Sequence, residues 1–135
     1  MNSEIKITTD KNKLDIEFIN SFISKSYWAK GRTLENMKVI INNSLNFGVF
    51  LNDFQIGYAR VVTDYGQFGY LMDVFITEVH QGKGYSKILM DFIMNYPDLE
   101  DVKVWRLATS DAHKLYEKYG FKQLKNPEKL MELIK

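Results

Sequence analysis

A glycine-rich turn stands between a run of residues typical of a strand and a run with helical spacing. The turn is QGKGYSK at residues 81–87, and the apolar run YLMDVFI precedes it at residues 70–76. Beyond the turn, apolar residues recur at i, i+3, i+4, i+7 and i+8, as Tyr85, Ile88, Leu89, Phe92 and Ile93. The pattern predicts a strand, a tight turn and a helix N-terminus, where unpaired N–H groups and the positive end of the helix dipole meet. Gly82 and Gly84 can adopt positive φ, so a phosphate or pyrophosphate could approach the backbone there.

The spacing of the turn excludes two common phosphate-binding loops. The dinucleotide fingerprint G-x-G-x-x-G requires a third glycine where this chain has Lys87. The nucleoside-triphosphate loop G-x-x-x-x-G-K-S/T also fails on spacing. Taken alone, the turn is equally consistent with a plain strand-to-helix connection that uses glycine only for tightness.

A second segment follows about 25 residues later and has the same strand-to-helix order. Residues 102–108 read as a strand, and residues 109–111 (TSD) lead into a short helix. One face of that helix is apolar and consists of Ala112, Leu115, Tyr116 and Tyr119. Gly120 then ends the helix as a C-terminal cap, and Phe121 begins a new apolar run.

Together the two segments resemble the GNAT superfamily of acyl-CoA-dependent N-acetyltransferases. The family's glycine loop, Q/R-x-x-G-x-G/A, is matched by Gln81 and Gly84, with Ser86 replacing the last small residue. Its second signature, N-x-x-A-x-x-L-Y-x-x-x-G-F, is matched at Ala112, Leu115, Tyr116, Gly120 and Phe121, with Thr109 replacing the asparagine. The resemblance covers residues 45–125 well, and residues 1–44 fit by element order only.

Composition limits the classes of protein to which the chain can belong. Its 135 residues are expected to form one domain, residues 1–135, with an ordinary hydrophobic content of 45%. A net charge of +1 argues against nucleic acid or an anionic membrane as a partner. With no cysteine and two histidines, neither a metal site nor a thiol nucleophile is expected. Residues 1–13 lack a signal-peptide apolar region, so a cytoplasmic location is expected.

The order of predicted elements gives the fold class. We expect an α/β (α+β) fold with a mixed, mostly antiparallel sheet, flanking helices and a splayed pair of parallel strands, as the GNAT resemblance implies. The expected strands are residues 4–8, 45–51, 55–63, 68–76 and 102–108, followed by two more near 121–124 and 130–134. The expected helices are residues 14–23, 34–43, 85–96 and 111–119.

The resemblance implies acetyl-CoA as co-substrate and assigns residues to it. The glycine loop would hold the pyrophosphate, and the pantetheine arm would pair like an extra strand with backbone groups near Val74 and Ile76. The expected cofactor-binding residues are Val74, Phe75, Ile76, Gln81, Gly82, Lys83, Gly84, Tyr85, Ser86 and Thr109. Tyr116 occupies the position of the family's frequent general acid, which protonates the departing thiolate. A core tyrosine on the same helix face is the alternative.

Removal of a proton from the acceptor amine needs a further group. Asp73 lies inside an apolar strand, where a carboxylate is costly unless it is paired or functional. It could act as the base, hold the substrate's ammonium group, or serve only as a structural cap; Glu78 and Tyr70 are rival candidates. The absence of cysteine favours direct transfer over an acyl-enzyme on a thiol.

The loop between the first two expected helices covers the acceptor site in this family. Here it carries Tyr27, Trp28 and Arg32, which we expect to bind the substrate. An arginine that suits a carboxylate, together with Asp73 for an ammonium group, predicts a small primary amine such as an amino acid. A non-catalytic acyl-CoA-binding module remains the main alternative, because Ser86 and Thr109 depart from the motifs. Members of the family often dimerise, so a homodimer is also possible.

Overall fold

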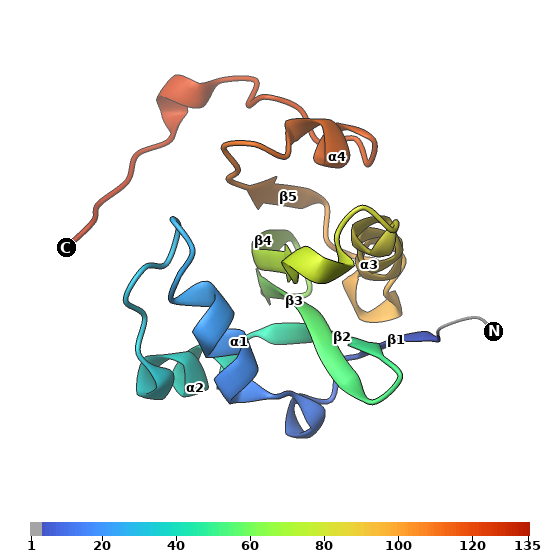
Figure 1. Ribbon diagram of the computed structural model, residues 1–135. Coiled ribbons are helices and arrows are strands. Elements are labelled where there is room, and N and C mark those ends of the chain that lie inside the picture. Colours follow the sequence, from blue (N-terminus) through green and yellow to red (C-terminus); the bar gives the residue numbers. More distant parts are fainter. Residues whose placement is uncertain (1–3) are drawn as a thin grey trace.

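The computed structural model describes residues 4–135 and contains one mixed five-stranded sheet (Figure 1). Its strands are β1 (Ile5–Thr8), β2 (Leu45–Leu51), β3 (Phe54–Thr63), β4 (Phe68–Ile76) and β5 (Val104–Leu107). They lie in sequence order, with antiparallel neighbours except for the parallel pair β4–β5. The predicted fold class, a mostly antiparallel sheet with one parallel pair, is therefore confirmed.

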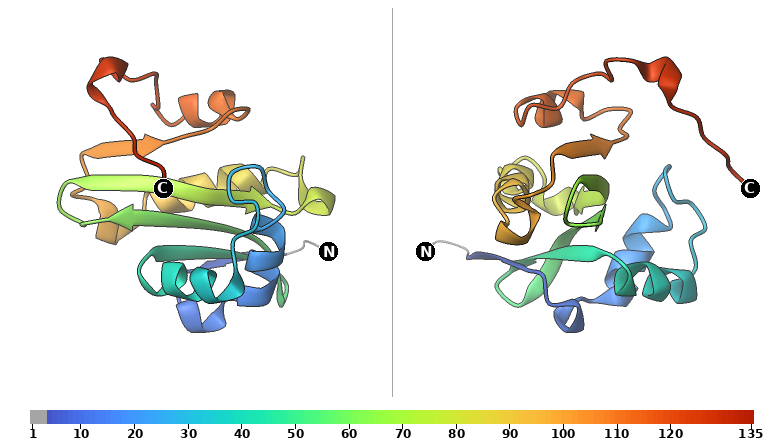
Figure 2. Two further views of the ribbon diagram at one scale, coloured as in Figure 1. Left: turned by 90° about the vertical axis from the view of Figure 1, so that its left-hand side faces the viewer. Right: turned by 180° about the vertical axis from the view of Figure 1, so that it is seen from behind.

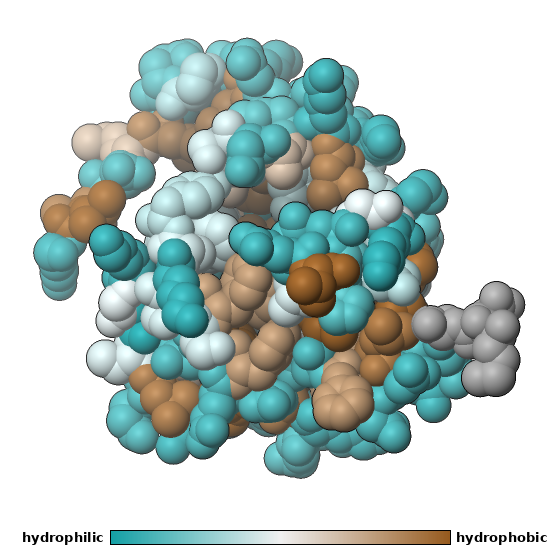
Figure 3. Space-filling view, in the orientation of Figure 1, coloured by the Kyte–Doolittle hydropathy of each residue, from teal (hydrophilic) through white to brown (hydrophobic). Residues whose placement is uncertain are grey.

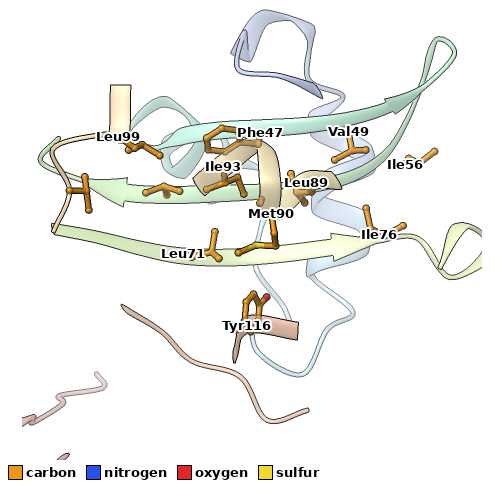
Figure 4. Packing of buried hydrophobic residues seen from close by; sticks show 13 residues of the cluster. Phe47, Val49, Ile56, Leu71, Ile76, Leu89, Met90, Ile93, Leu99 and Tyr116 are labelled. Atoms are coloured by element: carbon orange, nitrogen blue, oxygen red, sulfur yellow. The ribbon is translucent and has the colours of Figure 1, made fainter. Parts of the chain in front are cut away.

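Helices cover both faces of the sheet (Figures 1 and 2). They are α1 (Ile16–Ile23), α2 (Leu34–Asn42), α3 (Tyr85–Met94) and α4 (His113–Glu117). One apolar cluster joins α1 and α2 to Tyr58 and Phe75 of the sheet. The larger cluster joins Leu89, Met90 and Ile93 of α3 to the opposite face, with Tyr116 of α4 at its border (Figure 4). Within residues 4–135, no helix is long and apolar enough to span a membrane.

Side-chain caps explain where the first two helices begin. The Asp15 carboxylate accepts a hydrogen bond from the Phe18 N–H at 3.0 Å, and the Thr33 hydroxyl accepts one from the Asn36 N–H at 3.1 Å. Each cap satisfies a donor that has no partner inside its helix. The first helix therefore starts two residues later than its apolar spacing predicts, at Ile16 instead of Leu14.

Strand β4 carries a bulge in its middle. Tyr58 and Arg60 of β3 pair with Phe75 and Met72, so two residues of β4, Asp73 and Val74, stand opposite one residue of β3. Asp73 takes a left-handed backbone conformation with φ of 55°. An unbroken strand would place Asp73 on the same face as Leu71, inside the apolar core. The bulge instead turns its carboxylate toward the α1–α2 face.

The parallel strands β4 and β5 separate just before the bulge. Their pairing ends with Leu71 opposite Leu107, whereas β4 continues to Ile76 with only β3 as a partner among the described residues. The last five residues of β4 therefore present one free backbone edge. This edge leads directly into the glycine turn.

The two strands expected near residues 121–124 and 130–134 do not form. The chain instead runs through a single 3-10 turn, Pro127–Lys129, and ends in an extended tail. Helix α3 also ends at Met94 and α4 spans only five residues, both shorter than expected. A strand needs a neighbour for its backbone hydrogen bonds, and the described part of the chain supplies none for either segment.

Candidate acetyl-CoA and acceptor site

The glycine turn has the geometry that its sequence predicts. Gly82 and Gly84 have φ of 78° and 84°, and Gly84 is the N-cap residue of α3. The first helical hydrogen bond runs from the Ile88 N–H to the Gly84 carbonyl, so the N–H groups at positions 85–87 have no partner within the helix. A Cβ atom at Gly82 or Gly84 would meet no protein atom within 4 Å. The space over the turn is therefore open to a ligand.

Side chains of the turn shape its backbone. The Gln81 amide donates a hydrogen bond to the Ile76 carbonyl at 2.8 Å and so ties the turn to the end of β4. The Thr77 hydroxyl lies 2.9 Å from Nδ1 of His80 in the same turn. Lys83 is exposed, whereas Tyr85 and Ser86 are partly buried. Gln81 therefore stabilises the turn, and the hydrogen-bond donors that the turn leaves open are backbone N–H groups.

The end of β4 buries its side chains and leaves its backbone edge free. Phe75 stacks on Phe22 with ring centroids 3.9 Å apart, and Ile76 packs in the cluster under α3. Val74 lines the cleft beside the edge. Because the side chains of Phe75 and Ile76 point into the two cores, a ligand in the opening would meet Val74 and the backbone groups of residues 72–76. An elongated amide-bearing group is the kind of ligand that can pair with such an edge.

A cleft of about 430 Å³ opens at the point where β4 and β5 separate. Its walls come from three parts of the chain: the α1–α2 loop, the middle of β4, and the segment from β5 into α4. The α1–α2 loop contributes Tyr27, Trp28 and Arg32 to the lining, and the segment from β5 into α4 contributes Tyr116. The Ser110 hydroxyl donates a hydrogen bond to the Tyr27 hydroxyl at 2.7 Å, which links two of the walls. The structure thus brings together the residues expected to bind the acceptor.

The carboxylate of Asp73 is held by three donors. Oδ1 accepts a hydrogen bond from the Trp28 indole at 2.8 Å, and Oδ2 accepts from Arg32 at 2.7 Å and from Arg60 Nε at 2.6 Å. Its side chain has no exposed surface. Burial alone would raise the pKa of Asp73, but the hydrogen bonds and charges of Arg60 and Arg32 outweigh it and hold the pKa below its usual range.

This arrangement favours a structural role for Asp73 among the three considered from the sequence, which were a base, a site for the substrate's ammonium group and a structural cap. A carboxylate with a lowered pKa and three donors is a weak base, and two guanidinium groups repel a substrate ammonium group. Its contacts join β3, β4 and the α1–α2 loop, so Asp73 fixes the loop that carries Trp28 and Arg32 over the cleft.

Sequence reasoning missed Arg60, the second cation of this network. Arg60 lies in β3 within the apolar run YARVV and is 6% exposed. A second donor nitrogen of the same guanidinium lies 3.3 Å from the Ser44 hydroxyl. An arginine inside an apolar strand was itself a signal, because a buried cation requires a partner. Asp73, the buried aspartate on the neighbouring strand β4, is that partner.

Tyr116 lines the cleft from α4. It is 8% exposed and packs edge-on against Phe121, with ring centroids 6.0 Å apart. Burial raises the pKa of Tyr116 to about 12, and the nearby charge of Asp111 adds to the effect. The hydroxyl therefore remains protonated at neutral pH and is available to donate a hydrogen bond.

Thr109 forms the turn that places Tyr116. Its hydroxyl accepts hydrogen bonds from the Ala112 N–H at 3.1 Å and from the Asp111 N–H at 3.4 Å, just before α4. These bonds satisfy backbone N–H groups at the start of α4 that have no partner within the helix. The departure from asparagine at this position therefore leaves the turn into α4 capped.

Comparisons with known proteins agree with this geometry. Residues 43–123 match the acetyltransferase (GNAT) domain family. The chain is 44% identical to a candidate GNAT-family acetyltransferase from Xanthomonas campestris pv. campestris, whose crystal structure superimposes with a TM-score of 0.94 over 97% of this chain and 93% of that one. It is also 26% identical over 140 residues to a candidate acetyltransferase from Gibberella zeae, covering 86% of this chain and 78% of the relative.

A third likeness concerns the fold and a bound ligand. A candidate acetyltransferase from Clostridium acetobutylicum, solved with acetyl-CoA, is 17% identical and superimposes with a TM-score of 0.70 over 98% of this chain and 96% of its own. With the domain match over more than half of the sequence, the family is settled. The chain belongs to the GNAT family of acetyltransferases, which use acetyl-CoA as the acetyl donor.

Proposed function

We propose that this protein transfers the acetyl group of acetyl-CoA directly to a primary amine. The observation that carries the proposal is the continuity of three features. Strand β4 has a free backbone edge and leads into a glycine turn with open N–H groups. The same edge borders a cleft that Tyr116 lines. A pyrophosphate, an amide-bearing arm and a thioester occur in this order along acetyl-CoA.

The residues present fit acetyl-CoA mainly through their backbone. The open N–H groups at residues 82–87 suit the pyrophosphate, because the helix dipole and the unpaired donors point the same way. The free edge formed by Val74, Phe75 and Ile76 suits the pantetheine amides. A backbone N–H at the bulge could also polarise the thioester carbonyl, and loss of such a donor typically costs about 3 kcal/mol of transition-state stabilisation.

The reaction itself needs no covalent enzyme intermediate. The neutral amine attacks the carbonyl carbon, a C–N bond forms, the C–S bond breaks and its electron pair leaves with sulfur. The acceptor loses one proton from its ammonium group before the attack and a second from the same nitrogen afterwards. The departing thiolate gains one proton, so one proton is released overall. The chain has no cysteine to act as an acyl carrier, which favours direct transfer with both substrates bound.

Tyr116 is proposed to act on the departing sulfur. Its raised pKa keeps the hydroxyl protonated, so it can donate a hydrogen bond to the developing thiolate. Complete transfer of its proton to a thiolate whose conjugate acid has a pKa of ~8.5 would be uphill by roughly 5 kcal/mol. Tyr116 therefore stabilises the leaving group through a hydrogen bond. The proton that converts the thiolate into the thiol is the one lost from the amine nitrogen.

Asp73 is proposed to position the acceptor loop instead of removing the proton. Its three donors and lowered pKa leave it little basicity. The group formed by Arg32, Arg60 and Asp73 has a net charge of +1 beside the cleft. Such a charge attracts an anion, so the acceptor that we propose is a small amine with a carboxylate, such as an amino acid, bound near Arg32.

Replacing Gly84 with glutamate should weaken the binding of CoA by more than tenfold. The substitution adds a side chain and a negative charge where the pyrophosphate is expected, and it strains a backbone with φ of 84°. Gly84→Gln has the same shape and strain without the charge and should lose less affinity. Calorimetry with CoA measures both, and circular dichroism checks the fold. Unchanged affinity in Gly84→Glu would remove the turn from the binding site.

Replacing Arg32 with alanine should raise KM for a carboxylate-bearing amine far more than for the same amine without the carboxylate. The guanidinium bonds Asp73 through one nitrogen, and Arg32 also lines the cleft. Lys38→Ala removes an exposed cation from α2 and serves as the control. Steady-state kinetics on the matched amine pair supply the comparison. Equal increases for both amines would rule out the carboxylate role, and a preference for polyamines would overturn the proposed acceptor class.

A further inference from the structure

The contacts of Asp73 leave the ammonium group of the proposed acceptor without an anionic partner. The Asp73 carboxylate accepts three hydrogen bonds, and its side chain has no exposed surface. A primary amine reaches the protein as a cation, and a cation that leaves water for a cleft between protein walls requires a partner of opposite charge. A cleft that binds such an amine therefore needs a second carboxylate.

Asp111 supplies a second carboxylate to the same cleft. It lies between β5 and α4 and is the one acidic residue besides Asp73 that lines the cleft in the described part of the chain. Its side chain is exposed, and among residues 4–135 it forms neither a hydrogen bond nor an ion pair. The Asp111 carboxylate is therefore free to accept hydrogen bonds from a ligand, whereas that of Asp73 is not.

Hydrogen bonds hold the backbone around Asp111 against the rest of the cleft. The Asp111 N–H donates a hydrogen bond to the Thr109 hydroxyl at 3.4 Å, and the Ser110 hydroxyl donates one to the Tyr27 hydroxyl at 2.7 Å. The second bond joins this wall to the α1–α2 loop, which carries Arg32. Figure 3 shows the hollow between these two walls. One wall thus presents a carboxylate, and the wall bonded to it presents a guanidinium group.

We infer that Asp111 binds the ammonium group of the acceptor while Arg32 binds its carboxylate. The inference rests on the proposed function and specifies how the acceptor of that reaction is held. An α-amino acid carries both charges on one carbon atom, so two walls of opposite charge in a cleft of about 430 Å³ are complementary to it. Acetylation turns the ammonium group into a neutral amide and so removes the charge that Asp111 binds, which favours release of the product.

The position of Asp111 suits the reacting end of the acceptor. Burial is the main reason for the raised pKa of Tyr116, and the negative charge of Asp111 lies near enough to add to it. Because Tyr116 is proposed to contact the departing sulfur, an amine held by Asp111 would lie beside the thioester. Attack on the carbonyl carbon places positive charge on the nitrogen, and a neighbouring carboxylate stabilises that charge. Asp111 should therefore affect kcat as well as KM.

Replacing Asp111 with asparagine should lower kcat/KM for the acceptor by about 10- to 100-fold, the usual loss of a hydrogen bond to a charged group. Asp111→Glu keeps the charge and should retain most of the activity. Glu117→Gln removes an exposed carboxylate of the same helix that does not line the cleft, and should behave as wild type. Calorimetry with acetyl-CoA and urea denaturation should give the same affinity and stability for all three variants.

A matched set of ligands separates the two charged contacts. It contains the amino acid that the wild type acetylates fastest, the same amine without its carboxylate, and the 2-hydroxy acid that lacks the ammonium group. For phenylalanine, the last two are phenethylamine and phenyllactate. Asp111→Asn should raise KM for the amine and leave the inhibition constant of the hydroxy acid unchanged, whereas Arg32→Ala should have the opposite effects.

The outcomes distinguish this inference from the proposed function. Wild-type kinetics in Asp111→Asn, or an equal loss of affinity for the hydroxy acid, would overturn the role of Asp111 and leave acetyl transfer intact. A wild type that binds acetyl-CoA but acetylates no primary amine would overturn the proposed function and this inference with it.

Discussion

Replacing Asp73 with asparagine is expected to lower the free energy of unfolding by about 3–5 kcal/mol. The change leaves two guanidinium groups without their shared anion, and the side chains of Arg60 and Arg32 are only 7% and 15% exposed. Removing one partner of a buried ion pair costs this much because the remaining charge stays desolvated. Urea denaturation measures the loss. Asp91→Asn removes a half-exposed carboxylate paired with Lys87 and should cost far less, because solvent screens that pair.

The double variant Asp73→Asn/Arg60→Met tests whether the lost ion pair between these two residues causes the loss of stability. Removing the cation together with the anion should cost less than the two single changes added together. Additive effects would show that the two residues act independently, contrary to the contacts at β3 and β4.

The pH dependence of the Asp73 contribution follows from its lowered pKa. The folded-state pKa lies below the unfolded value of ~3.9, so the stabilisation is complete above that pH and is lost as pH falls through the folded pKa. The difference in stability between wild type and Asp73→Asn should therefore shrink below about pH 4. A difference that stays constant into strong acid would contradict the ionised carboxylate.

The same variant separates positioning from base catalysis. If Asp73 positions the loop, its replacement raises KM for the acceptor and leaves the pH dependence of kcat unchanged. If Asp73 removes the proton, kcat falls by ~10²–10⁴ and the acidic limb of the pH profile disappears. The second outcome would restore the catalytic role that the sequence suggested.

Replacing Tyr116 with phenylalanine is expected to lower kcat by about 10- to 100-fold with little change in the affinity for acetyl-CoA. The change removes only the hydroxyl that is proposed to stabilise the thiolate, and water can replace it in part. Tyr119→Phe is the matched control, because its hydroxyl bonds the Asp91 carboxylate of α3 at 2.7 Å and Tyr119 does not line the cleft, so its loss should not affect kcat. Wild-type turnover in Tyr116→Phe would reduce Tyr116 to a packing residue.

The raised pKa of Tyr116 predicts the shape of the pH–rate profile. The hydroxyl keeps its proton up to a pKa of about 12, so its deprotonation lowers kcat only above that value. The rate should therefore rise as the amine loses its proton and show no decline from Tyr116 between about pH 7 and 10. A falling alkaline limb in wild type that is absent from Tyr116→Phe would contradict the raised pKa.

The sequence was sufficient for the parts of the fold that depend on local pattern. Gly82 and Gly84 predicted positive φ because the turn between an apolar strand and a helix requires it there, and the structure confirms both. The two linked motifs predicted the order of β4, α3, β5 and α4. These features depend on residues close together in the chain, so spacing alone reveals them.

Features that depend on contacts between distant elements were harder to predict. Asp73 was singled out as costly in a strand, but its partners come from residues 28, 32 and 60, and only the bulge decides which face it takes. The strands expected at residues 121–124 and 130–134 do not form. A pattern shows that a segment can pair, and the sheet determines whether a neighbour is available.

Release of free thiol from acetyl-CoA, measured with and without an amine, tests the central claim most directly. The purified protein is mixed with acetyl-CoA and a panel of amino acids, decarboxylated amines and polyamines, and mass spectrometry identifies any acetylated product. We expect thiol release that depends on the amine, an acetyl group on its nitrogen, and the highest kcat/KM for an amine with a carboxylate. Tight binding of CoA without turnover on any primary amine would contradict the account and leave a CoA-binding module as the function.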